Sequence, residues 1–479
     1  MTIPLPSASR PYAFPKPVRR QLPNALTVYV IEDHRLPVVT YALEILAGNC
    51  DVEPSHSGLP SLVAGLLREG AGAHTSPEIS ALVDGCGGSM GAGAGDDITT
   101  AGGTFMKSYA ALGLELLADI VLRPRFPEDE IDRRVQQVLS GLAVNLDDPS
   151  YLVSLVASRV IYGPHPYAYP GDGTPATIGA LGRDDLVSFW KRCYAPHRAW
   201  FAVSGDVTPE EGFRLAEQAF GDWKGDATVL PAVLPPPIPR GARVVIVDMP
   251  QAVQTQLSIG HTGIPRNHPD FTALNVANQI FGGSFNSRLN MKIRAKEGLT
   301  YDASSGFEAQ RQAGLFTVNT FTRTEKTAEA LRLIVDLLQE FHDDPAQQDE
   351  FDEAKSYIHG SFALATETSG QVAERILAAA VHGLGEEYWT SYRERLEALT
   401  IGQVRAAVQR FIEPAKLSIV AVGDARAFST ELAAYGPTTV IPQAELDLVA
   451  ATLRTAITTQ NDHKTTGAPR HQRVTVNHR

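Results

Sequence analysis

A long internal repeat is the feature that most limits how this chain can fold. The segment Pro414–Asp424 matches Pro196–Asp206 at an offset of 218 residues, since both begin with Pro, continue through an apolar run and end in Gly-Asp. The apolar run Val38–Leu46 has a counterpart near Val253–His261 at a similar offset. Solenoid proteins repeat every ~20–50 residues. A period as long as this one therefore predicts two homologous domains in a single chain.

Prolines and polar tracts indicate where these domains begin and end. A chain of 479 residues is too long for one ordinary core. The run Val229–Pro239 holds five prolines in eleven residues, which is typical of a linker. We expect an N-terminal arm (1–20), a first domain (21–227), a Pro-rich linker (228–241), a second domain (242–445), and a C-terminal helix followed by a disordered tail (446–479).

Composition narrows the class of protein further. The net charge of -12 argues against a nucleic-acid partner, and no apolar run is long enough to predict a membrane span. The three cysteines are widely spaced and odd in number, so neither a disulfide framework nor a cysteine-rich zinc site is expected. Residues 1–6 lack the basic start and apolar core of a signal peptide. The default expectation is therefore the cytoplasm, or the periplasm if a leader was removed.

The stretch from Phe281 to Tyr301 carries the residues of most chemical interest. Apolar residues at helical spacing lead into Gly282-Gly283, where two glycines end or kink the helix. A second helix is expected to follow and to stop at Glu297-Gly298, because glycine is common just past a helix end. Next comes a run that favours a strand, so Arg294 is predicted in the last helical turn and Tyr301 at the strand's start.

Arg294 and Tyr301 together suit the recognition of a peptide. A guanidinium is always charged and donates through a planar fork, while a phenol donates or accepts one hydrogen bond. Such a pair can bind the carbonyls or the carboxylate of a peptide. The residues alone leave a structural interpretation open, in which Arg294 pairs with Glu297 and Tyr301 is an edge residue of the core.

The glycine-rich region from Gly85 to Gly103 invites comparison with a phosphate-binding loop. Asp96 and Asp97 follow the glycines directly and would repel phosphate, and Ile98–Thr100 favours a strand rather than a helix. We therefore interpret this region as a glycine-rich strand at the edge of a sheet. An edge with few side chains is able to pair with an extended peptide.

Several of these segments, taken in order, resemble the pitrilysin and mitochondrial-processing-peptidase family, the inverted zincins. The resemblance covers roughly residues 20 to 445 and rests on order and spacing rather than on one motif. It implies an α+β fold of two homologous domains, each with an antiparallel-rich sheet backed by helices. The segments that carry it are Tyr162–Tyr167, Phe189–Asp206, Phe281–Leu289 and Glu297–Tyr301.

The resemblance also shows what this chain has lost. Catalytic members of the family carry H-x-x-E-H on a helix of the first domain, where two His hold zinc and the Glu activates water. Here the matching positions are Ser61, Ala64 and Gly65, and the further ligand position falls near Ser140–Leu142, which has no carboxylate. No two histidines lie three or four residues apart. We expect no metal or other cofactor in this chain and zinc in a partner subunit.

The family resemblance changes the interpretation of the second-domain pair. In non-catalytic subunits an Arg and a Tyr seven residues later reach the peptide at the partner's zinc, and Arg294 and Tyr301 have that spacing. Gly282 and Gly283 match a glycine-rich loop that contacts substrate. The resemblance thus implies a non-catalytic subunit of a heterodimeric zinc peptidase that binds peptide beside a homologous, zinc-bearing partner. The alternatives are a non-proteolytic scaffold subunit of the same fold and an independent peptidase with unusual ligands.

Overall fold

The computed structural model describes residues 12–225, 233–238 and 241–455, and within them two six-stranded sheets. The first sheet has the order β1-β2-β6-β3-β5-β4. Its strands are β1 (Val18–Gln21), β2 (Thr27–Glu32), β3 (Val38–Ile45), β4 (Ser89–Ala94), β5 (Thr99–Met106) and β6 (Ala199–Gly205). All neighbouring strands pair antiparallel except β2 and β6, which are parallel.

The second sheet repeats this arrangement in the order β12-β7-β11-β8-β10-β9. Its strands are β7 (Arg243–Asp248), β8 (Gln254–Gly263), β9 (Ala303–Ala309), β10 (Gly314–Arg323), β11 (Ser418–Gly423) and β12 (Thr438–Pro442). Five strands occupy the same positions as their counterparts in the first sheet, and the sixth position is filled by β12, parallel to β7, instead of an antiparallel strand. The prediction of two homologous α+β domains with antiparallel-rich sheets is confirmed.

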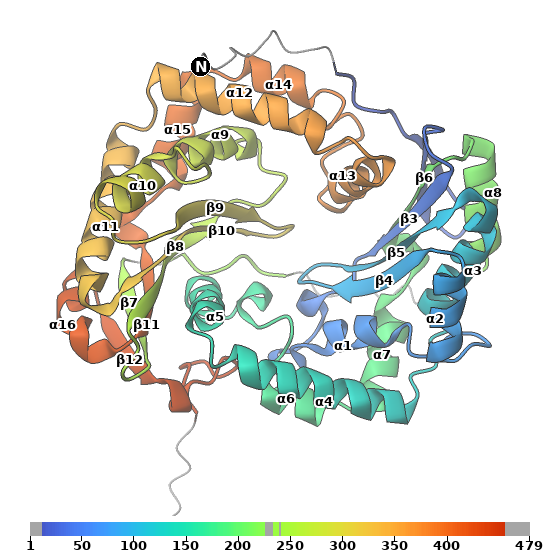
Figure 1. The fold of residues 1–479 in the computed structure, drawn as a ribbon, viewed down its shortest axis with the longest axis horizontal. Helices are drawn as coiled ribbons and strands as arrows, with labels where there is room; N and C mark the ends of the chain where they lie inside the picture. The colour runs from blue at the N-terminus through green and yellow to red at the C-terminus, as the bar shows by residue number, and fades with distance from the viewer. Residues whose placement is uncertain (1–11, 226–232, 239–240, 456–479) are drawn as a thin grey trace, which may run out of the picture.

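Helices back both sheets, and most have a counterpart in the other half (Figure 1). Those of the first half are α1 (Leu59–Leu66), α2 (Ser76–Gly85), α3 (Ala110–Leu122), α4 (Glu128–Asn145), α5 (Pro149–Tyr162), α6 (Pro175–Ala180), α7 (Arg183–Cys193) and α8 (Pro209–Phe220). Those of the second half are α9 (Phe271–Phe281), α10 (Arg288–Asn290), α11 (Thr327–Asp343), α12 (Gln348–Leu364), α13 (Ser369–Val381), α14 (Tyr392–Ala398), α15 (Ile401–Phe411) and α16 (Ser429–Leu432). Among the described residues, none of these helices is both long and apolar enough to cross a membrane.

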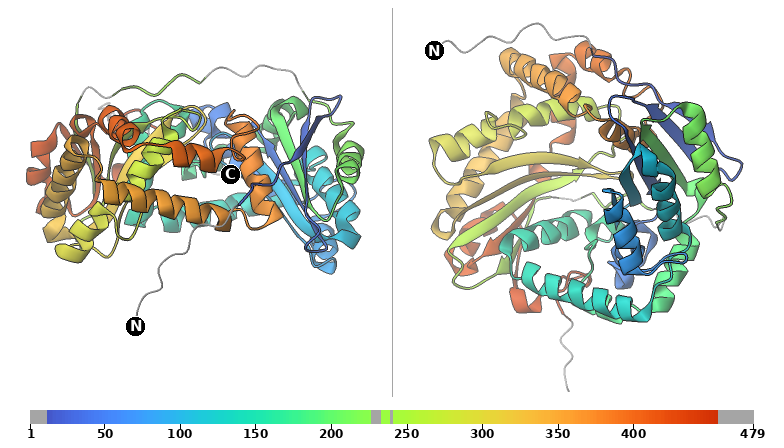
Figure 2. Two further views of the ribbon diagram at one scale, coloured as in Figure 1. Left: turned by 90° about the horizontal axis from the view of Figure 1, so that it is seen from above. Right: turned by 45° about the vertical axis from the view of Figure 1, so that its right-hand side comes forward.

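The two halves exchange one helix each. Helix α5 of the first half packs on β8 and β11, where Val156 and Val160 share a buried cluster with Val420 and Val422. Helix α13, its counterpart, packs on β6, β3 and β2 of the first sheet. Each half therefore covers part of the other's sheet, and burial of apolar surface on both faces holds the halves together. Two further views show the halves side by side around these exchanged helices (Figure 2).

The tips of two equivalent hairpins also meet at the seam between the halves. Gln310, in the turn between β9 and β10, donates to the Asp96 carboxylate over 2.9 Å. Burial raises the pKa of Asp96 to about 6. Asp97 accepts a hydrogen bond from the Tyr167 hydroxyl at 2.8 Å and another from the Arg311 backbone N–H at 3.2 Å. The two acidic residues that excluded a phosphate loop therefore serve as contacts between domains.

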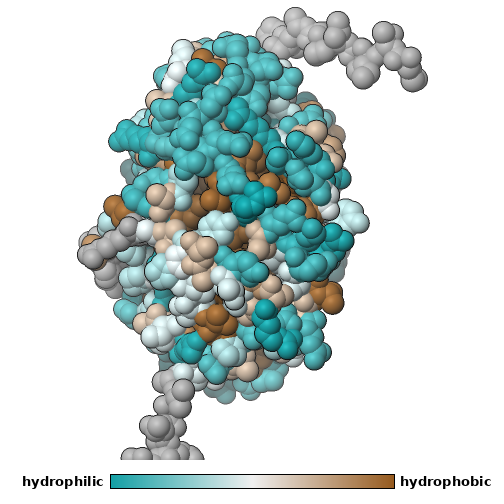
Figure 3. All heavy atoms as spheres, turned by 90° about the vertical axis from the view of Figure 1, so that its left-hand side faces the viewer, coloured by the Kyte–Doolittle hydropathy of each residue, from teal (hydrophilic) through white to brown (hydrophobic). Residues whose placement is uncertain are grey.

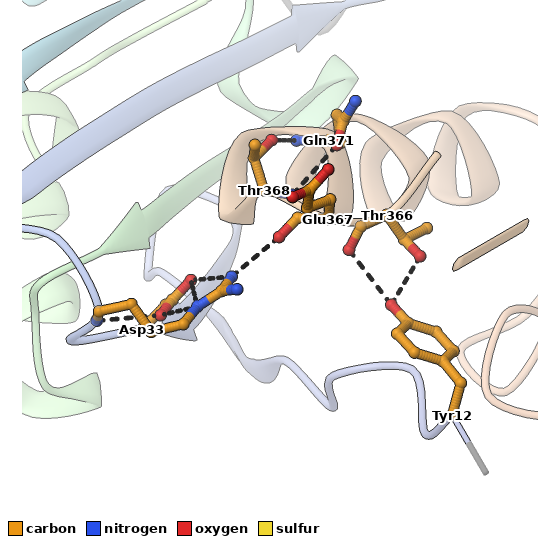
Figure 4. A network of polar contacts seen from close by, with 7 residues as sticks. Tyr12, Asp33, Thr366, Glu367, Thr368 and Gln371 are labelled. Carbon is orange, nitrogen blue, oxygen red and sulfur yellow. Dashed lines mark hydrogen bonds and ion pairs between the residues drawn. The ribbon is translucent and has the colours of Figure 1, made fainter. Parts of the chain in front are cut away.

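The N-terminal segment fastens the start of α13 to the first half (Figure 4). The Tyr12 hydroxyl donates to Thr366 Oγ1 over 2.6 Å. Arg35, held by Asp33 over 2.7 Å, donates to the carbonyl of Glu367 over 2.9 Å. The loop that leads into α13 is thereby fixed from two directions.

Three details differ from the sequence-based segments or lie outside the described residues. Residues 18–20 of the predicted arm belong to β1, because Val18–Gln21 pairs with β2. Much of the predicted linker lies outside the described residues. No C-terminal helix forms at 446–455, where Asp447 binds the backbone of Val449 and Leu446 bridges to Arg454, while residues 456–479 lie outside the described part.

Candidate functional site

The corner that follows α9 is the centre of the candidate site. Helix α9 ends at Phe281, and the carbonyl of the next residue, Gly282, accepts a hydrogen bond from Ser305 N on β9 at 3.0 Å. A side chain at Gly282 would place Cβ 2.3 Å from the Ser305 hydroxyl and 2.7 Å from its backbone nitrogen. Only glycine therefore permits this approach of helix end and strand. Gly283 is exposed and follows directly. Contact of either glycine with substrate stays a prediction.

The helix that carries Arg294 is shorter and wider than the sequence pattern indicates. Regular α-helix covers only Arg288–Asn290, and Met291–Lys296 forms a π-helix. Glu297 N donates to the carbonyl of Lys292, five residues earlier, over 3.1 Å. The turn then closes through Gly298, whose φ of 63° suits glycine. π-Helical turns are rare and are found frequently at functional sites.

Arg294 is oriented by an aromatic ring. Its guanidinium carbon lies 4.5 Å from the centre of the Phe285 ring, although Phe285 itself is 68% exposed. Among the described residues Arg294 forms no ion pair, and Glu297 pairs with Lys292 at 3.4 Å instead. The structural alternative that Arg294 pairs with Glu297 is therefore wrong. A cation held over a ring keeps its N–H donors free for a ligand.

Tyr301 projects into solvent. Its side chain is 85% exposed, the highest value among the large hydrophobic residues of the described chain. It lies in the bend between Gly298 and β9, so it precedes the strand that was predicted to begin with it. The interpretation of Tyr301 as an edge residue of the core is also wrong. Arg294 and Tyr301 thus flank one turn, each with its polar group available.

The outer surface of the second half is mainly hydrophilic. Figure 3 shows that face, with apolar atoms gathered toward its middle. Three of the exposed large hydrophobic residues lie within the stretch that leads to the candidate turn, namely Phe285, Met291 and Tyr301.

The glycine-rich region forms the edge strand that the sequence predicts. Strand β4 pairs with β5 on one side and has no strand on the other among the described residues. Gly91 has no atom within 4 Å of where a side chain would begin, and Gly93 has only the Thr100 hydroxyl at 4.0 Å. Arg68 donates to the carbonyl of Met90 over 2.6 Å at the start of this strand. Along the rest of β4, no bulky side chain obstructs the edge of the strand.

The helix that matches the zinc motif has a different chemistry here. It is α1, with Ser61 half-buried, Ala64 buried and Gly65 half-buried. Arg134 of α4 lies so close to Gly65 that an added Cβ would be 2.9 Å from its Nη2 and 3.0 Å from its Nε. A guanidinium therefore faces the position that would hold a metal ligand. Among the described residues no three His, Cys, Asp or Glu side chains are grouped to hold a metal, and these residues do not fit zinc.

The further metal-ligand position expected from the resemblance, near Ser140–Leu142, lies on α4, whereas the motif positions lie on α1. Gly141 and Leu142 of α4 line a cavity of about 240 Å³ together with Ser61. The positions that the resemblance assigns to the metal site thus line one cavity, and their equivalence to a metal site stays a prediction. The sequence analysis missed Arg134, although Arg134, Val138 and Gly141 share one helical face. The sequence analysis also did not identify Phe285. The signal that could have found it is an aromatic residue so soon after Gly282-Gly283.

Comparison with known proteins agrees with this architecture. Residues 180–358 match the family model described as the Peptidase M16 inactive domain. An uncharacterized zinc protease of Mycobacterium leprae (strain TN) is 26% identical over 405 residues, which span 82% of this chain and 89% of that protein. The uncharacterized zinc protease YmxG of Bacillus subtilis (strain 168) is 23% identical over 354 residues, which span 74% and 85% of the two chains.

Two solved structures share the fold over nearly their whole length. A peptidase M16 inactive domain from Pseudomonas fluorescens superposes with a TM-score of 0.80 and 28% identity, covering 89% of this chain and 99% of its own. A protease from Helicobacter pylori gives a TM-score of 0.80 with 22% identity and covers 85% and 99%. The latter likeness concerns the fold alone.

Fold and site together define a two-domain, peptidase-like α+β protein whose motif helix has no metal ligands. The resemblance to the pitrilysin and processing-peptidase family is confirmed: residues 180–358, which run from the end of the first half into the second, match the Peptidase M16 inactive-domain model, and the relatives above are similar over most of the chain. Its relatives carry the name zinc protease, whereas this chain has Ser61, Ala64 and Gly65 at the motif positions.

Proposed function

We propose that this chain is the non-catalytic, peptide-binding subunit of a heterodimeric zinc peptidase. It would donate Arg294 and Tyr301 to the active site of a homologous subunit that carries the metal. The observation that carries this proposal is the display of the two residues on one turn. Tyr301 is 85% exposed, and Arg294 is held over Phe285 without an acidic partner among the described residues.

This display is hard to explain by stability alone. An exposed phenol contributes little packing, and a side chain that buries no apolar surface contributes little to folding. The π-helix is a further unusual feature, because this geometry is rare and occurs frequently at functional sites. Both features are expected where a surface is shaped for a ligand, so they favour a role in binding over a purely structural one.

The chemistry assigned to the pair follows from what peptide hydrolysis requires. When water attacks a peptide carbonyl in the partner's site, negative charge develops on the carbonyl oxygen. A phenol positioned to donate to that oxygen stabilises the charge, and such donors lower the barrier by roughly 2.7–4 kcal/mol. The Arg294 fork would bind neighbouring backbone carbonyls of the same peptide and so fix its position.

Strand β4 offers the peptide a second support. An extended segment that pairs with an edge strand gains main-chain hydrogen bonds without a requirement for a particular sequence. The small residues of Ser89–Ala94 leave room for the side chains of such a segment. A peptide bound at this edge would be presented to the site that the two subunits complete.

The partner is the part of the proposal that is tested first. The tagged chain is purified from its native host, and co-purifying chains are identified and analysed for zinc. We expect a homologous chain that holds about one zinc, with peptidase activity in the pair and in neither chain alone. Recovery of the chain within a larger assembly that has no peptidase activity would contradict the proposal and favour the scaffold alternative.

A further inference from the structure

The cavity between α1 and α4 contains a positively charged group that the proposed function does not use. The cavity has a volume of about 240 Å³, and its floor is made by the two helices. Arg134 reaches into it from α4, and Ser61 and Leu62 line it from α1. This volume is below the roughly 300–1,000 Å³ of a typical small-molecule pocket, so it suits only a small group such as a single carboxylate.

Gly65 is what permits Arg134 to take this position. An added Cβ at Gly65 would be 2.9 Å from Nη2, 3.0 Å from Nε and 3.2 Å from Cζ, so all parts of the guanidinium are close to the helix backbone. The guanidinium therefore packs directly on α1. The missing side chain at Gly65 therefore leaves the space that the Arg134 guanidinium occupies.

Arg134 has unused hydrogen-bond donors in this position. Its Nη1 donates to Gln137 Oε1 over 3.0 Å, but its Nε is buried and has no partner. No acidic side chain of the described residues lies within ion-pair distance of it. The neighbouring Arg133, in contrast, pairs with Glu69 at 3.0 Å and with Glu130 at 2.7 Å. Nε is enclosed against α1, whereas Nη2 makes no hydrogen bond among the described residues, so Nη2 is the donor left for a ligand in the cavity. A guanidinium without an acidic partner favours an anion at such a place.

The other polar groups of the cavity mostly suit an anion as well. Ser61, Gln137 and Asn145 supply hydroxyl and amide donors. Asp172 also lines the cavity, is exposed, and opposes an anion. The cavity thus has one guanidinium and three neutral donors against one solvated carboxylate, and the guanidinium is the better buried of the two charges.

We propose that this cavity is a subsite for an acidic side chain of the bound peptide. The inference rests on the proposed function, because α1 packs against β4 and so lies beside the edge that would hold the peptide. Ser61, Gly65 and Arg68 follow each other along one face of this segment, and Arg68 contacts β4 at Met90. A peptide on β4 therefore passes close to the cavity.

The test compares peptides that differ in one charge. Pools of fluorescein-labelled decapeptides, with either Asp or Asn fixed at each position in turn, are titrated with the full chain. We expect at least one position at which Asp binds about tenfold more tightly than Asn, as for other hydrogen bonds to a charged group. Arg134→Met should abolish the preference, so that the Asp and Asn pools bind equally.

Two variants control for folding and for general charge. Arg133→Met removes a positive charge next to Arg134 but outside the cavity, so the preference should remain. Gly65→Ala adds only a methyl group, favours the helix and displaces the guanidinium, so the preference should fall while the chain stays folded. Asp172→Asn removes the opposing charge and should increase the preference.

The outcomes separate the subsite from the function on which it rests. Binding of all pools without an acid preference would overturn the subsite and leave peptide binding intact, whereas no binding of any pool would contradict the proposed function. Inorganic phosphate that competes with the Asp pools alone would support the anion chemistry. Phosphate that binds through Arg134 while no pool shows a preference would identify a free anion as the ligand and overturn the assignment to peptide.

Discussion

Arg294 lies with its guanidinium carbon 4.5 Å from the centre of the Phe285 ring, and both residues lie in the segment between α9 and Tyr301. Because the ring carries no formal charge, the guanidinium contacts it without being neutralised. Phe285 is 68% exposed, which means that packing in the core does not account for its position. In the proposed function, the ring would hold Arg294 in position for a ligand.

The first prediction follows from this contact. Phe285→Leu removes the cation–π interaction, which contributes about 0.5–1 kcal/mol at an exposed site. Peptide binding by the two-subunit complex should therefore weaken by about two- to fivefold, seen as an increase in KM with little change in kcat. Tyr357→Leu, at another exposed aromatic residue, serves as the control. An unchanged KM would show that the ring does not orient Arg294.

Arg294 itself tests recognition of the peptide backbone. Arg294→Lys keeps the charge but loses the planar fork, so peptide binding should weaken by about tenfold. Lys296→Gln removes a neighbouring exposed charge and should have little effect. Binding is measured by anisotropy of a labelled peptide with the complex. Equal losses in both variants would indicate general electrostatic attraction rather than a specific contact.

The motif helix predicts how the isolated chain behaves with metal. Ser61, Ala64 and Gly65 supply no strong zinc ligand, and the Arg134 guanidinium packs against Gly65. The purified chain should bind no stoichiometric zinc and hydrolyse no peptide, as measured by metal analysis after dialysis and by a fluorogenic assay. One tightly held zinc per chain, lost together with activity on addition of a chelator, would contradict this prediction and support an independent peptidase.

Glu44 predicts how stability depends on pH. It lies on β3, one of its carboxylate oxygens is buried without a hydrogen-bond partner, and burial with nearby Glu374 raises its pKa to about 8. The folded chain therefore keeps this proton to a higher pH than the unfolded chain does. The resulting stability is present below pH ~4.5 and is lost as pH rises through about 8.

The substitution Glu44→Gln removes this dependence. At pH 8.5 and above it should raise the free energy of unfolding by roughly 1–3 kcal/mol, because a buried charge is removed. Near pH 4.5 the variant and the parent chain should unfold alike. Urea denaturation at both pH values measures the difference, and Glu308→Gln, on β9, serves as the control. A gain of the same size at both pH values would mean that Glu44 is not charged in the folded chain.

Much of the fold was readable from the sequence because it is encoded locally. The repeat predicted two matching sheets, and the glycine-rich run predicted an edge strand, since both depend on residues close together in the chain. The exchange of α5 and α13 was not predicted, because the apolar face of a helix does not state which sheet it will cover. That choice depends on how the halves come together.

The candidate site shows the same limit. The positions of Arg294 and Tyr301 around one turn followed from helix and strand patterns. The π-helix did not follow from these patterns, because it forms when backbone hydrogen bonds span five residues instead of four. The packing of Arg134 on Gly65 joins two helices that are far apart in sequence, and no local pattern encodes such a contact. The family resemblance singled out positions on α1 and α4 but not the Arg134 guanidinium between these helices.

Tyr301 provides the most direct measurement of the central proposal. The zinc-bearing partner is combined with this chain or with its Tyr301→Phe variant, and complex formation and turnover of a peptide are measured together. The substitution removes one hydroxyl from a side chain that is 85% exposed, so folding and assembly should be unchanged. The proposal predicts that kcat falls by about 10²–10³ in an intact complex, with little change in KM. Unaltered turnover in that complex would contradict the proposal and leave the chain as a scaffold subunit.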